Sequence, residues 1–172
     1  MNFSRNCAEL KLQSNAFEAG KGAHVIEDIF NHLRIDDRLA TGGQPSAGQF
    51  DEIAAAGFAA VINLALPTSD DAISNEGELV SARGMTYVHI PVNFQIPARS
   101  DYETFAAIMK VFADRKVFIH CAMNMRVSAF IFLYRVQHEG ADTETALTDL
   151  HRVWEPGKVW QQFIDCLLME TK

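Results

Sequence analysis

The sequence predicts an α/β protein, a three-layer α/β/α domain with a mostly parallel central sheet. Short apolar runs rich in β-branched residues alternate with amphipathic segments of about ten residues, a pattern typical of parallel strands joined by crossover helices. The chain has 172 residues, 48% of them hydrophobic and 22% charged, so it can bury a full core without disulfides or metals. We expect residues 1–22 to form an N-terminal arm and residues 23–172 a single domain.

The first elements follow from hydrophobic periodicity and turn residues. Arg38–Gly43 is a short strand that ends in two glycines. Ser46 and Gln49 then match a capping box, in which each side chain binds the exposed backbone N–H group of the other residue. The helix that follows has an apolar face and ends at Gly57.

The middle of the chain repeats this alternation of strand and helix. Ala59–Ala65 is a buried strand by its length and its β-branched residues, and Pro67–Glu76 is a polar loop. A short helix then ends at Gly84, a residue that suits the left-handed position after a helix. Thr86–Val92 is the next strand.

The second half of the chain contains the last strand and the remaining helices. Ser100 or Asp101 is expected to cap a helix whose apolar residues have helical spacing. Lys116–His120 is a further strand, which leads through Cys121 into an apolar helix beginning near Val127. Two more amphipathic helices, separated by a Pro-Gly pair, complete the chain. Because ligands bind beyond the carboxyl ends of parallel strands, this order points to Cys121.

Charge and residue counts exclude several classes of protein. Fifteen Lys and Arg against 22 Asp and Glu give a net charge of −7, so we expect no nucleic-acid or membrane partner. A local group of hydrogen-bond donors can still bind an anion. The three cysteines, Cys7, Cys121 and Cys166, do not resemble a secreted disulfide framework. The six histidines lack ligand spacing, which predicts no metal site.

The sequence shows no targeting or membrane signal. The N-terminus has no continuous apolar segment, and the longest apolar run is too short to cross a bilayer. We therefore expect a cytoplasmic protein, or a periplasmic one if a signal was removed from a precursor. The sequence indicates no oligomeric state.

The strand, loop and helix around Cys121 carry the chemistry. The loop opens a helix, where backbone N–H groups and the helix dipole attract anions and favour a thiolate. Arg126 is placed to hold two oxygens of a phosphate, Ser128 to hydrogen-bond the thiolate, and His120 to order the loop through a hydrogen bond. The residues expected to bind phosphate are Ala122, Met123, Asn124, Met125 and Arg126.

This segment resembles the signature of the cysteine-dependent protein tyrosine and dual-specificity phosphatases, His-Cys-x-x-Gly-x-x-Arg-Ser. His120, Cys121 and Ser128 align with it. The sequence departs from the signature at two positions, since Asn124 replaces the glycine and Val127 stands where the arginine is usual.

A bacterial branch of these phosphatases is more similar. The phosphatase-like domain found with β-lactamase hydrolase-like proteins has only four residues between its cysteine and arginine, and Arg126 matches that spacing. Three other segments resemble the same branch, Ala40–Ser46, Val61–Leu64 and Tyr87–Val92, so the resemblance covers roughly residues 35–140. It implies the protein-tyrosine-phosphatase fold.

The resemblance also implies the family's mechanism. The thiolate of Cys121 attacks phosphorus, Arg126 and the loop amides stabilise the transition state, and water hydrolyses the phosphocysteine. No metal or cofactor takes part. Many relatives have an aspartic acid as the general acid where this sequence has Asn93. Asp101 is the nearest carboxylate after it, and is either that acid or the cap of the next helix.

Three functions stay open from the sequence. The first is a phosphatase acting on phosphotyrosine, other phosphoproteins or small phosphoesters. The second is a catalytically weak or inactive relative that binds phosphate or sulfate. The third is a sulfurtransferase of the rhodanese type, which also uses a cysteine in a cradle-shaped loop.

Overall fold

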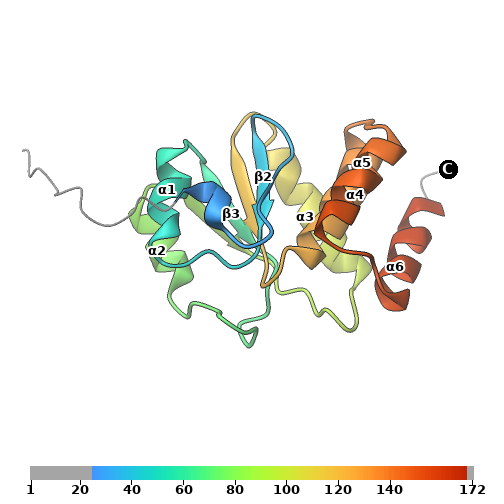
Figure 1. The fold of residues 1–172 in the computed structure, drawn as a ribbon, viewed down its shortest axis with the longest axis horizontal. Coiled ribbons are helices and arrows are strands. Elements are labelled where there is room, and N and C mark those ends of the chain that lie inside the picture. The colour runs from blue at the N-terminus through green and yellow to red at the C-terminus, as the bar shows by residue number, and fades with distance from the viewer. Residues whose placement is uncertain (1–24, 170–172) are drawn as a thin grey trace, which may run out of the picture.

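The computed structural model describes residues 25–169 and contains a five-stranded sheet of order β1-β2-β5-β3-β4 (Figure 1). The strands are β1 (Leu33–Arg34), β2 (Leu39–Gly42), β3 (Ala60–Asn63), β4 (Thr86–His89) and β5 (Val117–His120). The helices are the 3-10 turn η1 (Ile26–Asp28), α1 (Gln49–Ala55), α2 (Glu76–Ala82), α3 (Arg99–Val111), α4 (Met125–His138), α5 (Thr143–Val153) and α6 (Lys158–Met169). The predicted arm, residues 1–22, and Cys7 lie outside the described residues.

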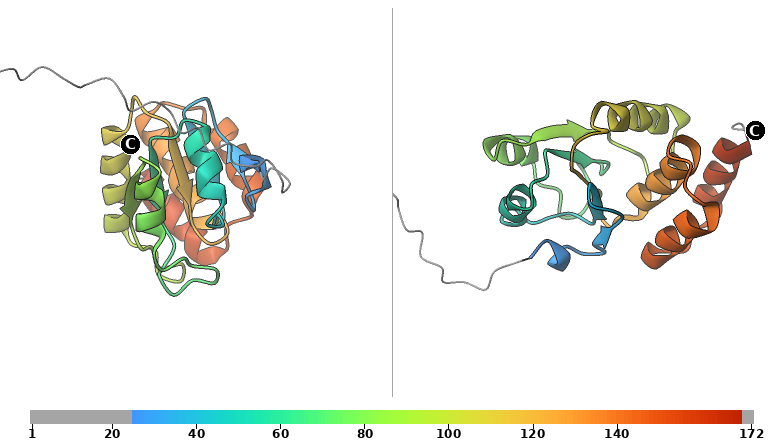
Figure 2. Two further views of the ribbon diagram at one scale, coloured as in Figure 1. Left: turned by 90° about the vertical axis from the view of Figure 1, so that its left-hand side faces the viewer. Right: turned by 90° about the horizontal axis from the view of Figure 1, so that it is seen from above.

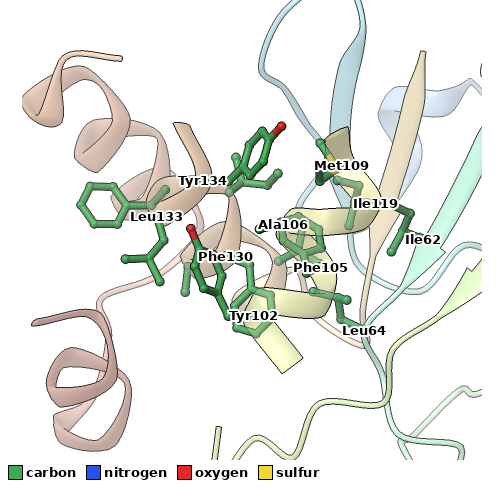
Figure 3. Packing of buried hydrophobic residues seen from close by; sticks show 14 of the residues in the cluster. Ile62, Leu64, Tyr102, Phe105, Ala106, Met109, Ile119, Phe130, Leu133 and Tyr134 are labelled. Carbon is green, nitrogen blue, oxygen red and sulfur yellow. The ribbon is translucent and has the colours of Figure 1, made fainter. Parts of the chain in front are cut away.

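Helices cover both faces of the sheet, which confirms the predicted three layers (Figure 2). On one face, α1 and α2 bury Phe50 and Val80 against Val61 and Phe118. On the other face, α3 and α4 pack on the sheet, and α5 and α6 pack on α4. Figure 3 shows Phe105 and Met109 of α3 next to Ile119 of the sheet, and the side chains of α4 belong to the same buried cluster. Burial of these apolar side chains supplies the main favourable free energy of folding.

The sheet is parallel except for β1, which pairs antiparallel with β2 at one edge. In the register, His120 at the end of β5 lies opposite Gly42 of β2 on one side and Asn63 of β3 on the other. The carboxyl ends of three neighbouring strands therefore meet where Cys121 follows β5. Within residues 25–169, no helix has the length and apolar character needed to cross a membrane.

The predicted capping box at α1 is half correct. The side chain of Gln49 accepts a hydrogen bond from the backbone N–H of Ser46 at 2.9 Å. The N-cap position belongs to Gly48, however, and no side chain caps it. Ser46 is held in a turn, donating its N–H group to Gln49 while its carbonyl accepts the N–H of Gln49, so it lies outside the helix.

Candidate active site

Cys121 lies at the centre of the carboxyl edge of the sheet. Cys121 is only 1% exposed, and its backbone N–H donates to the carbonyl of Gly42 at 3.4 Å. The loop that follows enters α4 at Met125, two residues earlier than the predicted start at Val127. The positive end of the α4 dipole is thus next to the cysteine, an arrangement that favours anions.

Asn124 occupies the glycine position of the phosphatase signature and takes a left-handed backbone conformation, with φ of 64°. Asparagine tolerates this conformation better than other residues with a side chain. Its Nδ2 atom donates to the carbonyl of Asn31 at 2.7 Å and to Oγ1 of Thr41 at 2.9 Å. The side chain of Asn31 in turn donates to the carbonyl of Met123 at 3.1 Å. The loop is therefore fastened to the segment around β1 and β2.

Arg126, on the first turn of α4, has no acidic partner among residues 25–169. It is only 8% exposed, and its buried Nε atom has no hydrogen-bond partner in that part of the chain. Its guanidinium lies 5.5 Å from the ring centroid of Phe94, a distance that allows a cation–π interaction. Because a buried cation without an anion is costly, this site is suited to a bound anion.

Phe94, from the loop after β4, is part of an aromatic cluster. Its ring lies 5.6 Å from that of Trp154 and 5.5 Å from that of Trp160. The indole of Trp160 also donates to the carbonyl of Phe94 at 2.9 Å. These contacts hold the loop after β4 against the C-terminal helices, and so fix the surface beneath Arg126.

The sequence predicted that the Ser128 hydroxyl hydrogen-bonds the thiolate of Cys121. In the structure this hydroxyl has other partners. Its Oγ donates to the carbonyl of Met125 at 3.0 Å and accepts the indole N–H of Trp154 at 3.1 Å. With the shorter loop, Ser128 is two residues past Arg126 and already within the helix, where its hydroxyl binds a carbonyl of the preceding turn.

His120 is completely buried, and its side chain pairs with a residue that sequence reasoning missed. The Nε2 atom of His120 lies 2.9 Å from Oε1 of Glu76, which is 2% exposed. Burial opposes ionisation of Glu76 most strongly. The hydrogen bond and the charge interaction with His120, together with the hydrogen bonds from Gln44 and Tyr87, outweigh it and hold the pKa of Glu76 below its ordinary value.

The two candidates for the general acid lie on the loop after β4 and on α3. Asn93 is exposed, and its Oδ1 accepts the backbone N–H of Gln95 at 2.9 Å. The expectation that Ser100 or Asp101 caps α3 was wrong. Ala98 is extended at the N-cap position and the helix begins at Arg99. Asp101 is thus inside the first turn, where a carboxylate still complements the helix dipole.

Comparisons with known proteins identify the family to which the chain belongs. Residues 17–163 match the family described as DSP-PTPase phosphatase fused to NAD+ kinase. A β-lactamase hydrolase-like protein of Agrobacterium fabrum is 33% identical over 98 residues, which are 55% of this chain and 22% of that relative. The chain therefore spans less than a quarter of that relative's length.

Solved structures give the same result for the fold. A DUF442 protein from Shewanella putrefaciens CN-32 superposes with a TM-score of 0.77 at 31% identity, covering 85% of this chain and 96% of that one. P. aeruginosa TpbA in complex with phosphotyrosine has a TM-score of 0.65 at 14% identity, over 87% of this chain and 93% of that one. Because residues 17–163 are most of its length, the chain belongs to the family that they match, the DSP-PTPase phosphatases described as fused to NAD+ kinase.

Proposed function

We propose that this protein hydrolyses phosphate monoesters through a phosphocysteine formed on Cys121. The observation that carries the proposal is the pairing of a cysteine at the carboxyl end of the central strand with Arg126 on the first turn of the following helix. The buried guanidinium of Arg126 has no acidic partner among residues 25–169. A phosphoryl group held between them would supply the missing negative charge.

The chemistry then proceeds in two displacements. In the first, the Cys121 thiolate forms a bond to phosphorus as the bond to the leaving oxygen breaks, and a general acid gives that oxygen a proton. In the second, water attacks phosphorus, the sulfur–phosphorus bond breaks, and the residue that served as acid takes the proton of the water. Arg126 and the loop amides stabilise the oxygens that gain charge in both steps.

For the general acid we propose Asp101. Its position in the first turn of α3, directly after the loop that contains Phe94, supports this assignment. The Asp101 carboxylate makes no hydrogen bond or ion pair with another described residue, so no structural contact competes for it. Asn93 is an amide and cannot give up a proton as a carboxylic acid does.

Aryl phosphates, including phosphotyrosine, are the proposed substrates. The half-buried ring of Phe94 beside Arg126 offers an aromatic surface next to the anion site, and such a surface suits a flat apolar leaving group. Small phosphoesters that present the same phosphate dianion are proposed as substrates as well.

Hydrolysis of p-nitrophenyl phosphate and phosphotyrosine by the wild-type protein and two serine variants tests the proposal. Cys121→Ser is expected to abolish turnover, whereas Cys166→Ser, at an exposed free thiol on α6, is expected to retain it. A wild-type protein without turnover, whose phosphate binding is lost in Arg126→Ala, would instead be the phosphate-binding relative. Transfer of sulfur from thiosulfate to cyanide would make it a sulfurtransferase.

A further inference from the structure

Glu76 connects the carboxyl ends of three neighbouring strands. Its Oε1 atom lies 2.9 Å from Nε2 of His120, at the end of β5, and accepts the amide N–H of Asn63, at the end of β3, at 3.0 Å. Its Oε2 atom accepts the amide N–H of Gln44, which follows β2, at 2.6 Å. A single carboxylate on the first residue of α2 thus binds residues at or just after the carboxyl ends of three neighbouring strands, next to the loop of residues 121–126.

Two of these partners directly contact the start of the loop. His120 immediately precedes Cys121, and its own carbonyl accepts the backbone N–H of Leu64 at 2.8 Å. The backbone N–H of Gln44 donates to the carbonyl of Ala122 at 3.1 Å. Through these two residues Glu76 is linked to the backbone on both sides of the cysteine.

The charge of Glu76 opposes the chemistry of the site next to it. A carboxylate close to an anion-binding loop repels a phosphate, and the repulsion is strong where water is excluded. Glu76 is 2% exposed and held ionised by its hydrogen-bond partners, so this cost is present in the folded protein. Any favourable effect of Glu76 on phosphate binding must therefore come from the positions in which its hydrogen bonds hold His120 and Gln44.

We infer that Glu76 is the positioning residue of the phosphate loop, acting through His120 and Gln44 to hold Cys121 and Ala122 in the shape that binds phosphate. The inference rests on the proposed function of the loop as an anion site. It assigns to α2 a role that neither the family signature nor the loop sequence contains. The inference gives Glu76 no contact with substrate, so its effect is measured as a change in phosphate affinity.

Calorimetric titration of inorganic phosphate into Cys121→Ser, in which the thiolate charge is absent, tests the inference. Glu76→Gln is added to this parent variant, with Glu78→Gln as the matched control, because Glu78 lies on the same helix but is exposed. Loss of a negative charge alone would tighten phosphate binding. A positioning role predicts weaker binding by about tenfold, the lower end of the effect that outer-sphere partners have at metal sites.

Gln44→Ala provides a second test, since it removes only one of the hydrogen bonds to Glu76. It is expected to weaken phosphate binding as well, while Glu78→Gln is expected to leave it unchanged or slightly tighter. If Glu76 serves only the stability of the fold, Glu76→Gln and Gln44→Ala will lower the thermal midpoint and leave the phosphate affinity unchanged. That result would overturn the inference. If the parent binds no phosphate, both the inference and the proposed function fail. If it binds phosphate but the wild type shows no turnover, only the proposed function fails.

Discussion

The indole Nε1 of Trp154 donates a hydrogen bond to Oγ of Ser128 at 3.1 Å. The segment that follows α5 is thereby joined to the first turn of α4, the helix that carries Arg126. The hydroxyl of Ser128 already donates to the carbonyl of Met125, so both of its hydrogen bonds hold structure together.

Ser128→Ala is therefore expected to reduce stability more than activity. The change leaves the half-buried indole N–H of Trp154 without its acceptor, at a cost of about 1 kcal/mol. Urea unfolding measures this loss, and turnover of p-nitrophenyl phosphate is expected to stay at the wild-type level. An unchanged unfolding midpoint with a large fall in kcat would show that Ser128 acts on the thiolate after all.

Asn124 offers a test of the loop backbone. Asn124→Ala places a side chain in the left-handed conformation without the stabilising amide and removes the bonds to Asn31 and Thr41, which together cost about 2–4 kcal/mol. Asn124→Gly loses the same bonds but adopts this conformation freely, so it is expected to be more stable than the alanine variant. Equal unfolding free energies for the two variants would show that the left-handed backbone contributes nothing.

The parts of the site that lie close together in the sequence could be predicted from it. Cys121 and Arg126 could be proposed as site residues because a strand, a loop and a helix follow one another within a few residues, and the order of strands places the strand ends at one edge. The left-handed conformation of Asn124 could also have been inferred from the glycine at the equivalent signature position, although not the partners of its side chain.

Contacts between residues far apart in the sequence could not be predicted, because no local sequence pattern indicates them. Glu76 stands at the end of a polar loop, 44 residues before His120, and nothing in its surroundings indicates a buried carboxylate. Trp154 reaches Ser128 across 26 residues, a contact that depends on how α5 packs on α4. The two-residue strand β1 was missed because it is too short to show a period of two.

The buried Glu76 predicts a pH dependence of stability. Its pKa is depressed in the folded protein, so its contribution is fully present above the ordinary glutamate pKa of about 4.3 and is lost as the pH falls through the folded value. Urea unfolding between neutral pH and the acid range is expected to show a smaller decline for Glu76→Gln than for the wild type.

Other carboxylates also contribute to the loss of stability in acid. Comparing the wild type with Glu76→Gln separates the contribution of Glu76 from theirs. The hydrogen bond from Arg83 lowers the pKa of Asp51, and the hydrogen bonds from Thr145 lower that of Asp142, so both destabilise the fold in acid with the same sign. These contributions are shared by the wild type and Glu76→Gln. Parallel curves for the two proteins would mean that Glu76 gains nothing from its ionisation in the folded state.

The assignment of Asp101 as general acid predicts a dependence on the leaving group. Asp101→Asn is expected to reduce kcat for phosphotyrosine by about 10²-fold or more, because a phenolate of high basicity needs a proton as it departs. Turnover of p-nitrophenyl phosphate, whose leaving group is far less basic, is expected to fall much less. A uniform loss on both substrates would indicate damage to binding.

Asn93→Asp supplies the complementary measurement. The Asn93 side-chain oxygen accepts the backbone N–H of Gln95, and an aspartate can make the same bond, so the loop is expected to keep its shape. Added to Asp101→Asn, the new carboxylate stands at the position where the resemblance to the phosphatases places the acid, and it is expected to restore much of the phosphotyrosine turnover. Added to the wild type, it is expected to change kcat little, since Asp101 already supplies the proton. The opposite result would be a large rise in kcat when Asn93→Asp is added to the wild type, with no fall in kcat for Asp101→Asn alone. It would show that the natural protein works without a general acid and that Asp101 only stabilises α3.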